Sequence, residues 1–296
     1  MLTNILSAFP FSPIQPFHKG LERRPESLQS SISLTYLGTA GFVFSGSNRT
    51  LVVDPYVTRP SLNQHAFTKL QSDEYLVKKW IPNADDVLVG HAHHDHILDA
   101  PCVCHQTGAR LIGSEDVIRV GRAAGVPESQ MLATHGRDDI ACGEGNLVRG
   151  IPAAHGKVYF NRVPLPGRIP DTFKWPTNYW RFRHGHVLNW YIELDGLKFM
   201  HVDSAEFFAK EWNGLEVDVL CLCAIGRNSR PNYIEEAISI VKPKIVMACH
   251  WDCFWIPMEA EQQYTLPMVD LEGFIRDVEA FGSEPMVLPV GATVGL

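Results

Sequence analysis

The sequence lacks several features that would place it in a specialised class. No apolar run reaches the roughly 18 residues that a membrane-spanning helix requires. The first residues, MLTNILSAFPFSPIQPF, have neither the basic start nor the long apolar stretch of a secretory signal. There is no basic surplus, because the net charge is −7 and the pI is near 6.0. We therefore expect a cytoplasmic protein that neither spans a membrane nor binds nucleic acid.

Cysteine is present in an odd number, without the spacing of a disulfide framework. The seven cysteines are Cys102, Cys104, Cys142, Cys221, Cys223, Cys249 and Cys253. Several have apolar neighbours, which is typical of reduced thiols in the core of a cytosolic protein. The two pairs that are separated by a single residue are interpreted as core thiols, not as a further metal site.

Strand and helix patterns alternate along the chain, with no repeat, coiled coil, low-complexity tract or break in composition. Apolar residues make up 45% and charged residues 20% of the 296 residues, as in an ordinary globular α/β protein. The expected strands are 31–37, 42–44, 51–53, 86–89, 146–151, 187–194, 197–202, 217–222 and 244–248, and the expected helices are 62–80, 114–124, 231–241 and 270–281. We expect an irregular N-terminal arm at 1–30 and a single domain at 31–296.

A cluster of histidines directly follows the apolar strand expected at 86–89. The segment reads Gly90-His91-Ala92-His93-His94-Asp95-His96. In an extended chain, His91 and His93 point to the same side. Neighbouring imidazoles would repel one another if protonated, and each would need hydrogen-bond partners if buried and neutral. Imidazole nitrogens together with a carboxylate form a ligand set that suits Zn²⁺, Mn²⁺ or Fe²⁺, so the cluster indicates a metal site.

Three later segments repeat one arrangement, in which an apolar strand is followed at once by a possible ligand. His155, Asp203 and His250 each come directly after such a strand. In α/β folds, functional sites gather beyond the carboxyl ends of strands. We therefore expect these three side chains to meet the histidine cluster and to complete the ligands for two metal ions.

These motifs resemble the metallo-β-lactamase superfamily. The chain has an H-x-H-x-D-H motif that is followed by a lone His, a lone Asp and a last His. The opening Tyr36-Leu37-Gly38-Thr39-Ala40-Gly41 and Leu51-Val52-Val53-Asp54-Pro55 also look like that family's first strands. They look most like its branch of ascorbate-phosphate lactonases and phosphodiesterase-type hydrolases. The resemblance spans about residues 31–255 and implies a four-layer αββα sandwich with metal ions at one edge.

The resemblance also implies roles for individual residues. One metal ion would be held by His91, His93 and His155, the other by Asp95, His96 and His250, with Asp203 as the bridge. Asp54 matches a supporting residue of the family rather than a ligand. The implied cofactor is a pair of divalent metal ions. Zinc is the favoured metal, and manganese and iron are the alternatives.

The complete ligand set favours an active hydrolase over a degenerate member of the family. A metal pair activates a shared water for attack on an ester, lactone or phosphoester. Asp95 is the predicted catalytic residue, because it could orient that water or carry its proton. His184 and His201 are considered as proton donors but are left outside the predicted site. Two alternatives stay open: a phosphodiesterase or phospholipase-like hydrolase in place of a lactonase, and a non-catalytic, metal-dependent binding module.

The segment 157–186 is unusually long and carries a charge opposite to that of the whole chain. It holds one acid, Asp171, and six basic residues: Lys157, Arg162, Arg168, Lys174, Arg181 and Arg183. Aromatic residues are interleaved with these charges. We expect a lid over the metal site whose arginines clamp an anionic small-molecule substrate. The alternatives are a solvated surface loop, a contact within a homo-oligomer and a lipid-facing surface.

Overall fold

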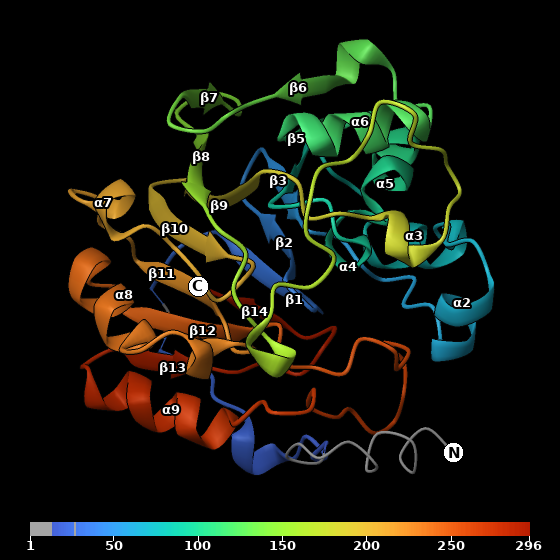
Figure 1. Cartoon of the computed structure of the whole chain (residues 1–296). Coiled ribbons are helices and arrows are strands. Elements are labelled where there is room, and N and C mark those ends of the chain that lie inside the picture. The colour runs from blue at the N-terminus through green and yellow to red at the C-terminus, as the bar shows by residue number, and fades with distance from the viewer. Residues whose placement is uncertain (1–13, 27) are drawn as a thin grey trace.

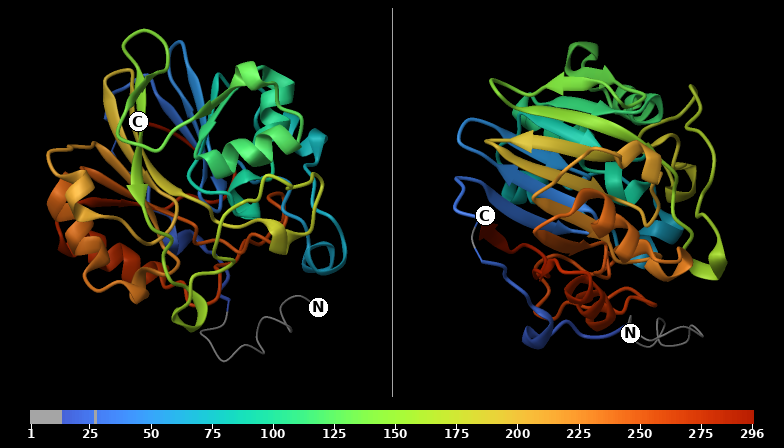
Figure 2. Two further views of the ribbon diagram at one scale, coloured as in Figure 1. Left: turned by 45° about the horizontal axis from the view of Figure 1, so that its top comes forward. Right: turned by 90° about the vertical axis from the view of Figure 1, so that its left-hand side faces the viewer.

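A computed structural model describes residues 14–26 and 28–296 of the chain. Two seven-stranded sheets lie face to face, and helices cover the outer side of each sheet (Figures 1 and 2). The four-layer α/β sandwich that the sequence predicts is therefore confirmed. Among the described helices, none is both long enough and apolar enough to cross a membrane.

The first sheet comes from the N-terminal half of the chain, and the last strand closes one of its edges. Its spatial order is β14 (Thr293–Gly295), β1 (Ser33–Gly38), β2 (Gly41–Ser45), β3 (Thr50–Val53), β4 (Asp86–Val89), β5 (Arg110–Gly113) and β6 (Met131–Ala133). The strands from β14 to β3 are antiparallel, whereas β3 to β6 are parallel. The helices of this half are α2 (Leu62–Phe67), α3 (Glu74–Trp80), α4 (His94–Ile97), α5 (Ala100–Thr107) and α6 (Glu115–Ala123).

The second sheet comes from the C-terminal half. Its spatial order is β13 (Glu284–Met286), β12 (Ile245–Cys249), β11 (Val219–Cys223), β10 (Leu197–Val202), β9 (Val187–Leu194), β8 (Leu147–Ala153) and β7 (Asp139–Ala141). Strands β10 to β13 are parallel. Strand β8 runs in the same direction as β10, because both are antiparallel to β9. The helices of this half are α7 (Ala209–Trp212), α8 (Tyr233–Val241) and α9 (Leu271–Ala280).

Aromatic side chains fill the space between the two sheets. Phe44 of β2 meets Phe199 of β10 edge to face, with ring centroids 5.0 Å apart. Phe42 meets the ring of His201 at 5.6 Å, and His201 Nε2 donates to the carbonyl of Ala40 over 2.8 Å. These side chains are fully buried. His201, which the sequence left as a candidate proton donor, is thus a core residue that packs between the sheets.

The helix predicted at 62–80 is two helices in the structure. Helices α2 and α3 are separated by extended chain in which Leu70 pairs with Thr177 of the 157–186 segment. Asp73 begins the second helix, because its carboxylate accepts a hydrogen bond from the backbone of Leu76 over 3.0 Å. The prediction of one helix was wrong because the break depends on pairing with a distant segment.

The short strands β5, β6, β7, β13 and β14 were not predicted, since three or four residues give too little periodicity. Helices α4, α5 and α7 were not predicted either. The predicted strands and the helices predicted at 114–124, 231–241 and 270–281 begin and end within about two residues of the predicted bounds. The described part of the chain also has five 3₁₀ turns: η1 (Lys19–Leu21), η2 (Glu128–Gln130), η3 (Tyr159–Asn161), η4 (Tyr179–Arg181) and η5 (Arg227–Ser229).

The N-terminal arm expected at 1–30 is described only from residue 14 onward, apart from residue 27. This part makes two isolated bridges to the C-terminal part of the chain, from Pro16 to Tyr264 and from Arg23 to Val287. Phe17 stacks on Trp251 with ring centroids 4.7 Å apart. The described part of the arm therefore packs against the domain.

Candidate metal centre

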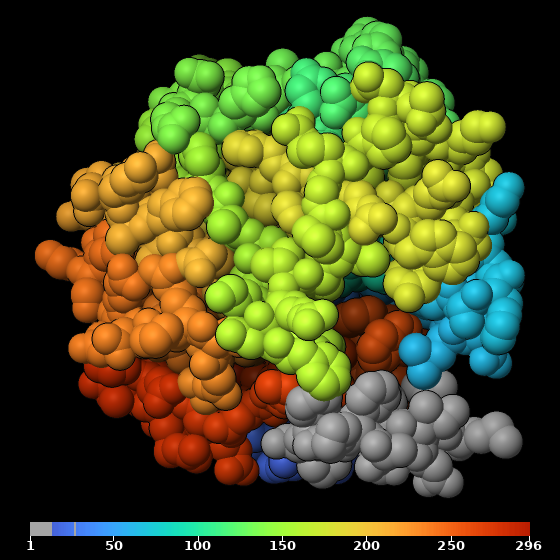
Figure 3. All heavy atoms as spheres, viewed as in Figure 1, coloured from blue at the N-terminus to red at the C-terminus, as the bar shows by residue number. Residues whose placement is uncertain are grey.

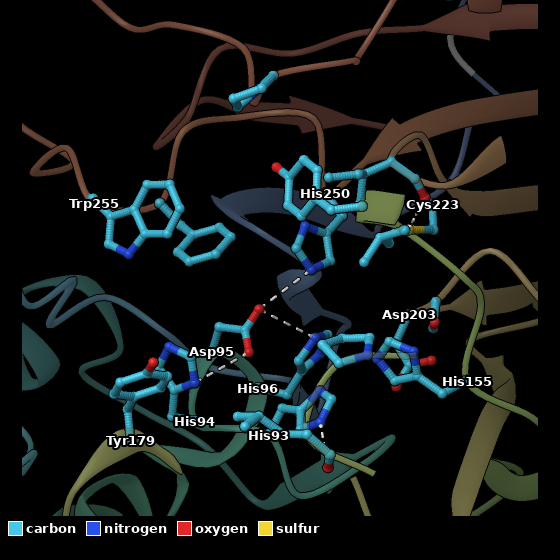
Figure 4. Close-up of a pocket in the computed structure, with 18 of the residues that line it drawn as sticks. His93, His94, Asp95, His96, His155, Tyr179, Asp203, Cys223, His250 and Trp255 are labelled. Carbon is cyan, nitrogen blue, oxygen red and sulfur yellow. Dashed lines mark hydrogen bonds and ion pairs between the residues drawn. The ribbon is translucent and has the colours of Figure 1, made fainter. Parts of the chain in front are cut away.

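Strand direction brings the predicted ligands to one edge of the sandwich. His91 follows β4 in the first sheet, while His155, Asp203 and His250 follow β8, β10 and β12 in the second. These three strands of the second sheet share one direction, so their carboxyl ends lie at the same edge. Figure 4 shows the side chains from both sheets pointing into a common space. The convergence that the sequence predicts is therefore present.

The first group of possible ligands consists of His91, His93 and His155, whose ligand atoms lie within 4.8 Å of one another. His91 Nε2 and His93 Nδ1 face each other at 2.9 Å. His155 Nδ1 lies 2.7 Å from the carbonyl oxygen of Gly156 and therefore donates to it. This hydrogen bond fixes the tautomer and leaves the other ring nitrogen of His155 as a lone-pair donor for a metal.

The second group consists of Asp95, His96 and His250, again within 4.8 Å. Asp95 Oδ2 lies 3.4 Å from His250 Nε2 and 3.7 Å from His96 Nε2. Asp203 joins the two groups, because it clusters with His91 and His96 within 4.8 Å and its Oδ2 lies 2.6 Å from His91 Nδ1. All seven predicted ligands thus lie in neighbouring groups, each of which could hold a metal ion.

Asp54 binds no predicted ion but holds the predicted ligand His96 and the backbone of Gly90 in position. Its Oδ1 accepts a hydrogen bond from the backbone of Gly90 over 2.7 Å, and its Oδ2 faces His96 Nδ1 at 2.9 Å. The carboxylate therefore orients His96 so that Nε2 points toward Asp95. Gly90 is also required for a steric reason, since a Cβ atom there would lie 2.1 Å from Asp203 Oδ2. The supporting role predicted for Asp54 agrees with this geometry.

The electrostatics of the site favour neutral histidines beside an ionised carboxylate. Burial, reinforced by the neighbouring imidazoles, holds the pKa values of His91, His93 and His96 well below the ordinary histidine value. Burial alone would raise the pKa of Asp95, but His96, His94 and His250 hold it well below its usual range. Neutral imidazoles and a carboxylate are the forms that bind a metal ion.

Several buried polar atoms of the site make no hydrogen bond with the described residues. They include Asp203 Oδ1 and His250 Nδ1. Such atoms are costly unless a further partner is present. Nitrogen and oxygen donors in these numbers suit a borderline divalent cation. The residues therefore fit a metal centre.

The sequence pattern of the beta-lactamase superfamily domain matches residues 33–250, which include all seven predicted ligands. The chain belongs to the metallo-β-lactamase superfamily. A UPF0173 metal-dependent hydrolase of Symbiobacterium thermophilum is 27% identical over 275 residues, which cover 90% of this chain and 100% of the relative. A UPF0173 metal-dependent hydrolase of Thermococcus onnurineus is 26% identical over 241 residues, which cover 78% of this chain and 89% of the relative.

Among solved structures, Igni18, a novel metallo hydrolase from Ignicoccus hospitalis, has a similar fold. It covers 89% of this chain and 97% of its own, with a TM-score of 0.57 at 21% identity. The superfamily and the hydrolase class that the sequence predicts are therefore confirmed. The narrower resemblance to ascorbate-phosphate lactonases stays a prediction.

A cavity of about 470 Å³ opens onto the metal edge of this metallo-β-lactamase-fold hydrolase. Six of the seven predicted ligands line it, and His91 alone of the seven does not; the lining ligands are His93, Asp95, His96, His155, Asp203 and His250. In Figure 4, His250 and Trp255 lie on one side of the space and His93, His94 and Asp95 on the other. Figure 3 shows the face on which the 157–186 segment, in yellow-green, covers this region.

His94 is the residue of the site whose position the sequence did not predict. It belongs to neither ligand group, lines the cavity and makes no hydrogen bond with the described residues, although its Nδ1 lies 3.6 Å from Asp95 Oδ1. Its ring sits among aromatic rings, including those of His65 at 4.8 Å and Tyr56 at 5.9 Å. Burial lowers the pKa of His94 to about 4, so its imidazole is neutral at pH 7.

His184, the second histidine left outside the predicted site, lies near the ligands without joining them. Its ring centroid is 5.8 Å from that of His155 and 5.9 Å from that of His93. Its Nδ1 donates to the carbonyl of Gly185 over 2.6 Å, and it does not line the cavity. His184 therefore lies beside the ligand groups and belongs to none of them.

Segment 157–186 forms one wall of the cavity through Val158, Tyr159, Phe160, Pro164, Leu165 and Tyr179. Its basic residues do not take part. Five of the six are exposed, Arg183 is half-buried, and none lines the cavity. The predicted arginine clamp is therefore wrong, because the segment turns its aromatic and aliphatic side chains inward and its charges outward.

A buried carboxylate of the first half of the chain holds the wall at two points, in addition to the bridge between Leu70 and Thr177. Asp116 of α6 accepts hydrogen bonds from the backbone of Ile169 over 2.8 Å and of His186 over 3.0 Å. Arg168 reaches the same carboxylate over 2.7 Å. Asp116 therefore holds two points of the segment that are far apart along it, a role that no local sequence signal indicates.

Proposed function

We propose that the chain is a dinuclear metal-dependent hydrolase that acts on an ester, lactone or phosphoester. The observation that carries the proposal is the juxtaposition of two ligand groups linked by Asp203, at the base of a cavity large enough for a small molecule. His91, His93 and His155 would hold one ion, and Asp95, His96 and His250 the other. Two divalent ions, with zinc first and manganese or iron as alternatives, would supply an activated water and polarise the substrate oxygen.

The chain's own residues have separable tasks in this reaction. Asp95 lines the cavity as a carboxylate at neutral pH, so it can orient the attacking water and accept its proton. Asp54 holds the orientation of His96. Ser204 accepts a hydrogen bond from the backbone of Gly156 over 2.8 Å and thereby fixes the loop that carries His155. The wall formed by segment 157–186 limits the access of water and serves as the cover of the site.

The first experiment is elemental analysis of the purified protein, alone and after loading with zinc, manganese or iron. It is accompanied by assays with p-nitrophenyl hexanoate and bis(p-nitrophenyl) phosphate. About two ions per chain are expected, with turnover of at least one substrate. Metal binding without any turnover would favour the non-catalytic binding module. A protein that binds no metal and turns over neither substrate would overturn the proposal.

Replacement of Asp95 by Ala tests the mechanism within the same assay. Loss of a carboxylate that both binds metal and positions water should lower kcat/KM by on the order of 10³-fold. The matched control is Asp138→Ala, since Asp138 is exposed and far from the ligands in the chain. Circular dichroism should be unchanged in both variants. Near wild-type turnover in Asp95→Ala would contradict the role assigned to this residue.

A further inference from the structure

The cavity beside the predicted metal ligands has polar groups at the ligands and mainly apolar side chains elsewhere. Apart from the ligands, its walls are mainly aliphatic and aromatic: Val158, Tyr159, Phe160, Pro164, Leu165, Tyr179, Ile225, Phe254, Trp255 and Pro267. Among the described residues no lysine or arginine lines it, and the only acids there are Asp95 and Asp203. Residues 1–13 contain no charged side chain at all. The chain therefore offers no side-chain charge to a substrate beyond the metal edge itself.

A second apolar part of the cavity wall is a pair of packed aromatic rings, Phe254 and Trp255. Phe254 and Trp255 have ring centroids 4.7 Å apart. Phe254 also lies 5.8 Å from His250 and 6.4 Å from His94. The aromatic wall thus begins directly beside a predicted metal ligand. A group attached to the bond that reacts at the metal edge would lie against these rings.

A charged substituent would pay a large desolvation penalty in such a cavity. An ionised group that leaves water needs a counter-charge or several hydrogen bonds to compensate. The basic residues of the segment do not supply them, since they lie outside the cavity and Arg168 already pairs with Asp116. An apolar substituent, in contrast, gains from burial against Trp255 and Leu165.

We propose that the substrate is an uncharged carboxylic ester or lactone whose alkyl or aromatic group fills the cavity lined by segment 157–186 and by Phe254 and Trp255. The inference rests on the proposed hydrolase function and narrows it. A cavity of about 470 Å³ is within the usual range for small-molecule sites, roughly 300–1,000 Å³. The proposed uncharged substrate takes the place of the anionic substrate that the composition of segment 157–186 suggested.

A matched pair of esters tests the charge preference. p-Nitrophenyl hexanoate and the mono-p-nitrophenyl ester of adipic acid share the reacting bond and the chain length, but only the second carries a terminal carboxylate. With the metal-loaded enzyme, kcat/KM for the hexanoate should exceed kcat/KM for the adipate monoester by about tenfold or more. It should exceed kcat/KM for p-nitrophenyl acetate by a similar factor, because the acetate lacks the alkyl chain that the cavity would bury. Equal or faster turnover of the adipate monoester would overturn the inference.

Binding of a pair that cannot be hydrolysed gives a readout without turnover. Heptan-2-one and 6-oxoheptanoate differ in the same way as the two esters, and calorimetric titration of the metal-loaded protein measures their affinities. Heptan-2-one should bind more tightly. Trp255→Ala should weaken it by about tenfold, whereas Trp180→Ala and Arg181→Ala should not, because both of these side chains are exposed and outside the cavity.

The turnover and binding experiments distinguish a failure of the hydrolase proposal from a failure of the uncharged-substrate proposal. Ester turnover with a preference for the adipate monoester would sustain the hydrolase and reject the uncharged substrate. Selective binding of heptan-2-one that depends on Trp255, with no turnover of any ester or phosphodiester, would reject the hydrolase and sustain the chemistry of the cavity. Loss of heptan-2-one binding in Arg181→Ala, with no loss in Trp255→Ala, would reject the cavity as the binding site.

Discussion

The two sides of the cavity differ in how the chain builds them. The metal edge consists of residues that follow buried strands of the two sheets, together with Asp95 and His96 on the short helix α4 after β4. The opposing wall, in segment 157–186, contains only two short 3₁₀ turns and depends on tertiary contacts such as those of Asp116. The residues that could bind metal are thus positioned by the two sheets, whereas segment 157–186, which would contact a substrate, is positioned by tertiary contacts.

Among changes that spare the ligands themselves, replacement of Asp54 should have the largest effect, and it should act on the metal edge and not on the 157–186 segment, because Asp54 contacts Gly90 and His96. Removing its carboxylate frees His96 Nδ1 and leaves the backbone of Gly90 without its partner. Asp54→Ala should therefore weaken metal binding and lower kcat/KM by about 10- to 100-fold. Competition with a chelator measures the affinity. Asp54→Asn, which keeps an acceptor for Gly90, should recover part of the loss, and unchanged affinity in both variants would refute the supporting role.

Asp116 is the corresponding test for the opposing wall. Its replacement by Ala leaves the backbone donors of Ile169 and His186 unpaired, at a cost of about 1–3 kcal/mol each in the free energy of unfolding. The segment should become more susceptible to limited proteolysis, and kcat/KM for p-nitrophenyl hexanoate should fall by about tenfold. Metal stoichiometry should stay as in the wild type.

The matched control for this variant is Asp171→Ala. Asp171 lies in the same segment but is exposed, and it pairs only with Arg119 among the contacts of the described residues. It should leave proteolysis and turnover unchanged. A loss of metal from Asp116→Ala would show that the two sides of the cavity are not independent, and the comparison between them would fail.

The same contrast explains which features the sequence could predict. His155, Asp203 and His250 each follow an apolar strand, and strands of one direction end at one edge, so local patterns were enough to bring them to the histidine cluster. The resemblance to a known family then assigned them to two groups. The supporting position of Asp54 was predicted in the same way, from the motif at the end of β3.

The interior of the cavity could not be predicted in this way. Segment 157–186 has no helical or strand period, so nothing in the sequence indicates which side chains turn inward. Its many arginines suggested an anion clamp, yet Leu165 and Tyr179 line the cavity and Arg181 is exposed. The break between α2 and α3 was missed for a related reason, because Leu70 pairs with Thr177 of this segment.

His65 lies where the two sides of the cavity meet, between His94 at 4.8 Å and Tyr179 at 5.9 Å. Its Nδ1 donates to the carbonyl of Ser61 over 3.0 Å, and its Nε2 faces the hydroxyl of Tyr56 at 3.5 Å. Burial lowers the pKa of His65, although the Ser61 carbonyl and the charge of Asp95 act in the opposite direction. The neutral ring, which can accept from Tyr56, is therefore the form that the folded protein favours.

This shift predicts a small pH dependence of stability. A histidine whose folded-state pKa lies below its unfolded value of about 6.5 contributes fully above pH 6.5. That contribution is lost as the pH falls through the folded-state pKa. Metal-free wild type should thus lose stability below pH 6.5 more steeply than metal-free His65→Phe, by at most about 1.4 kcal/mol per pH unit. Urea denaturation at several pH values between 7.5 and 5 measures both proteins. Parallel curves would mean that His65 titrates as it does in the unfolded chain, and that the junction between the two sides is open to water.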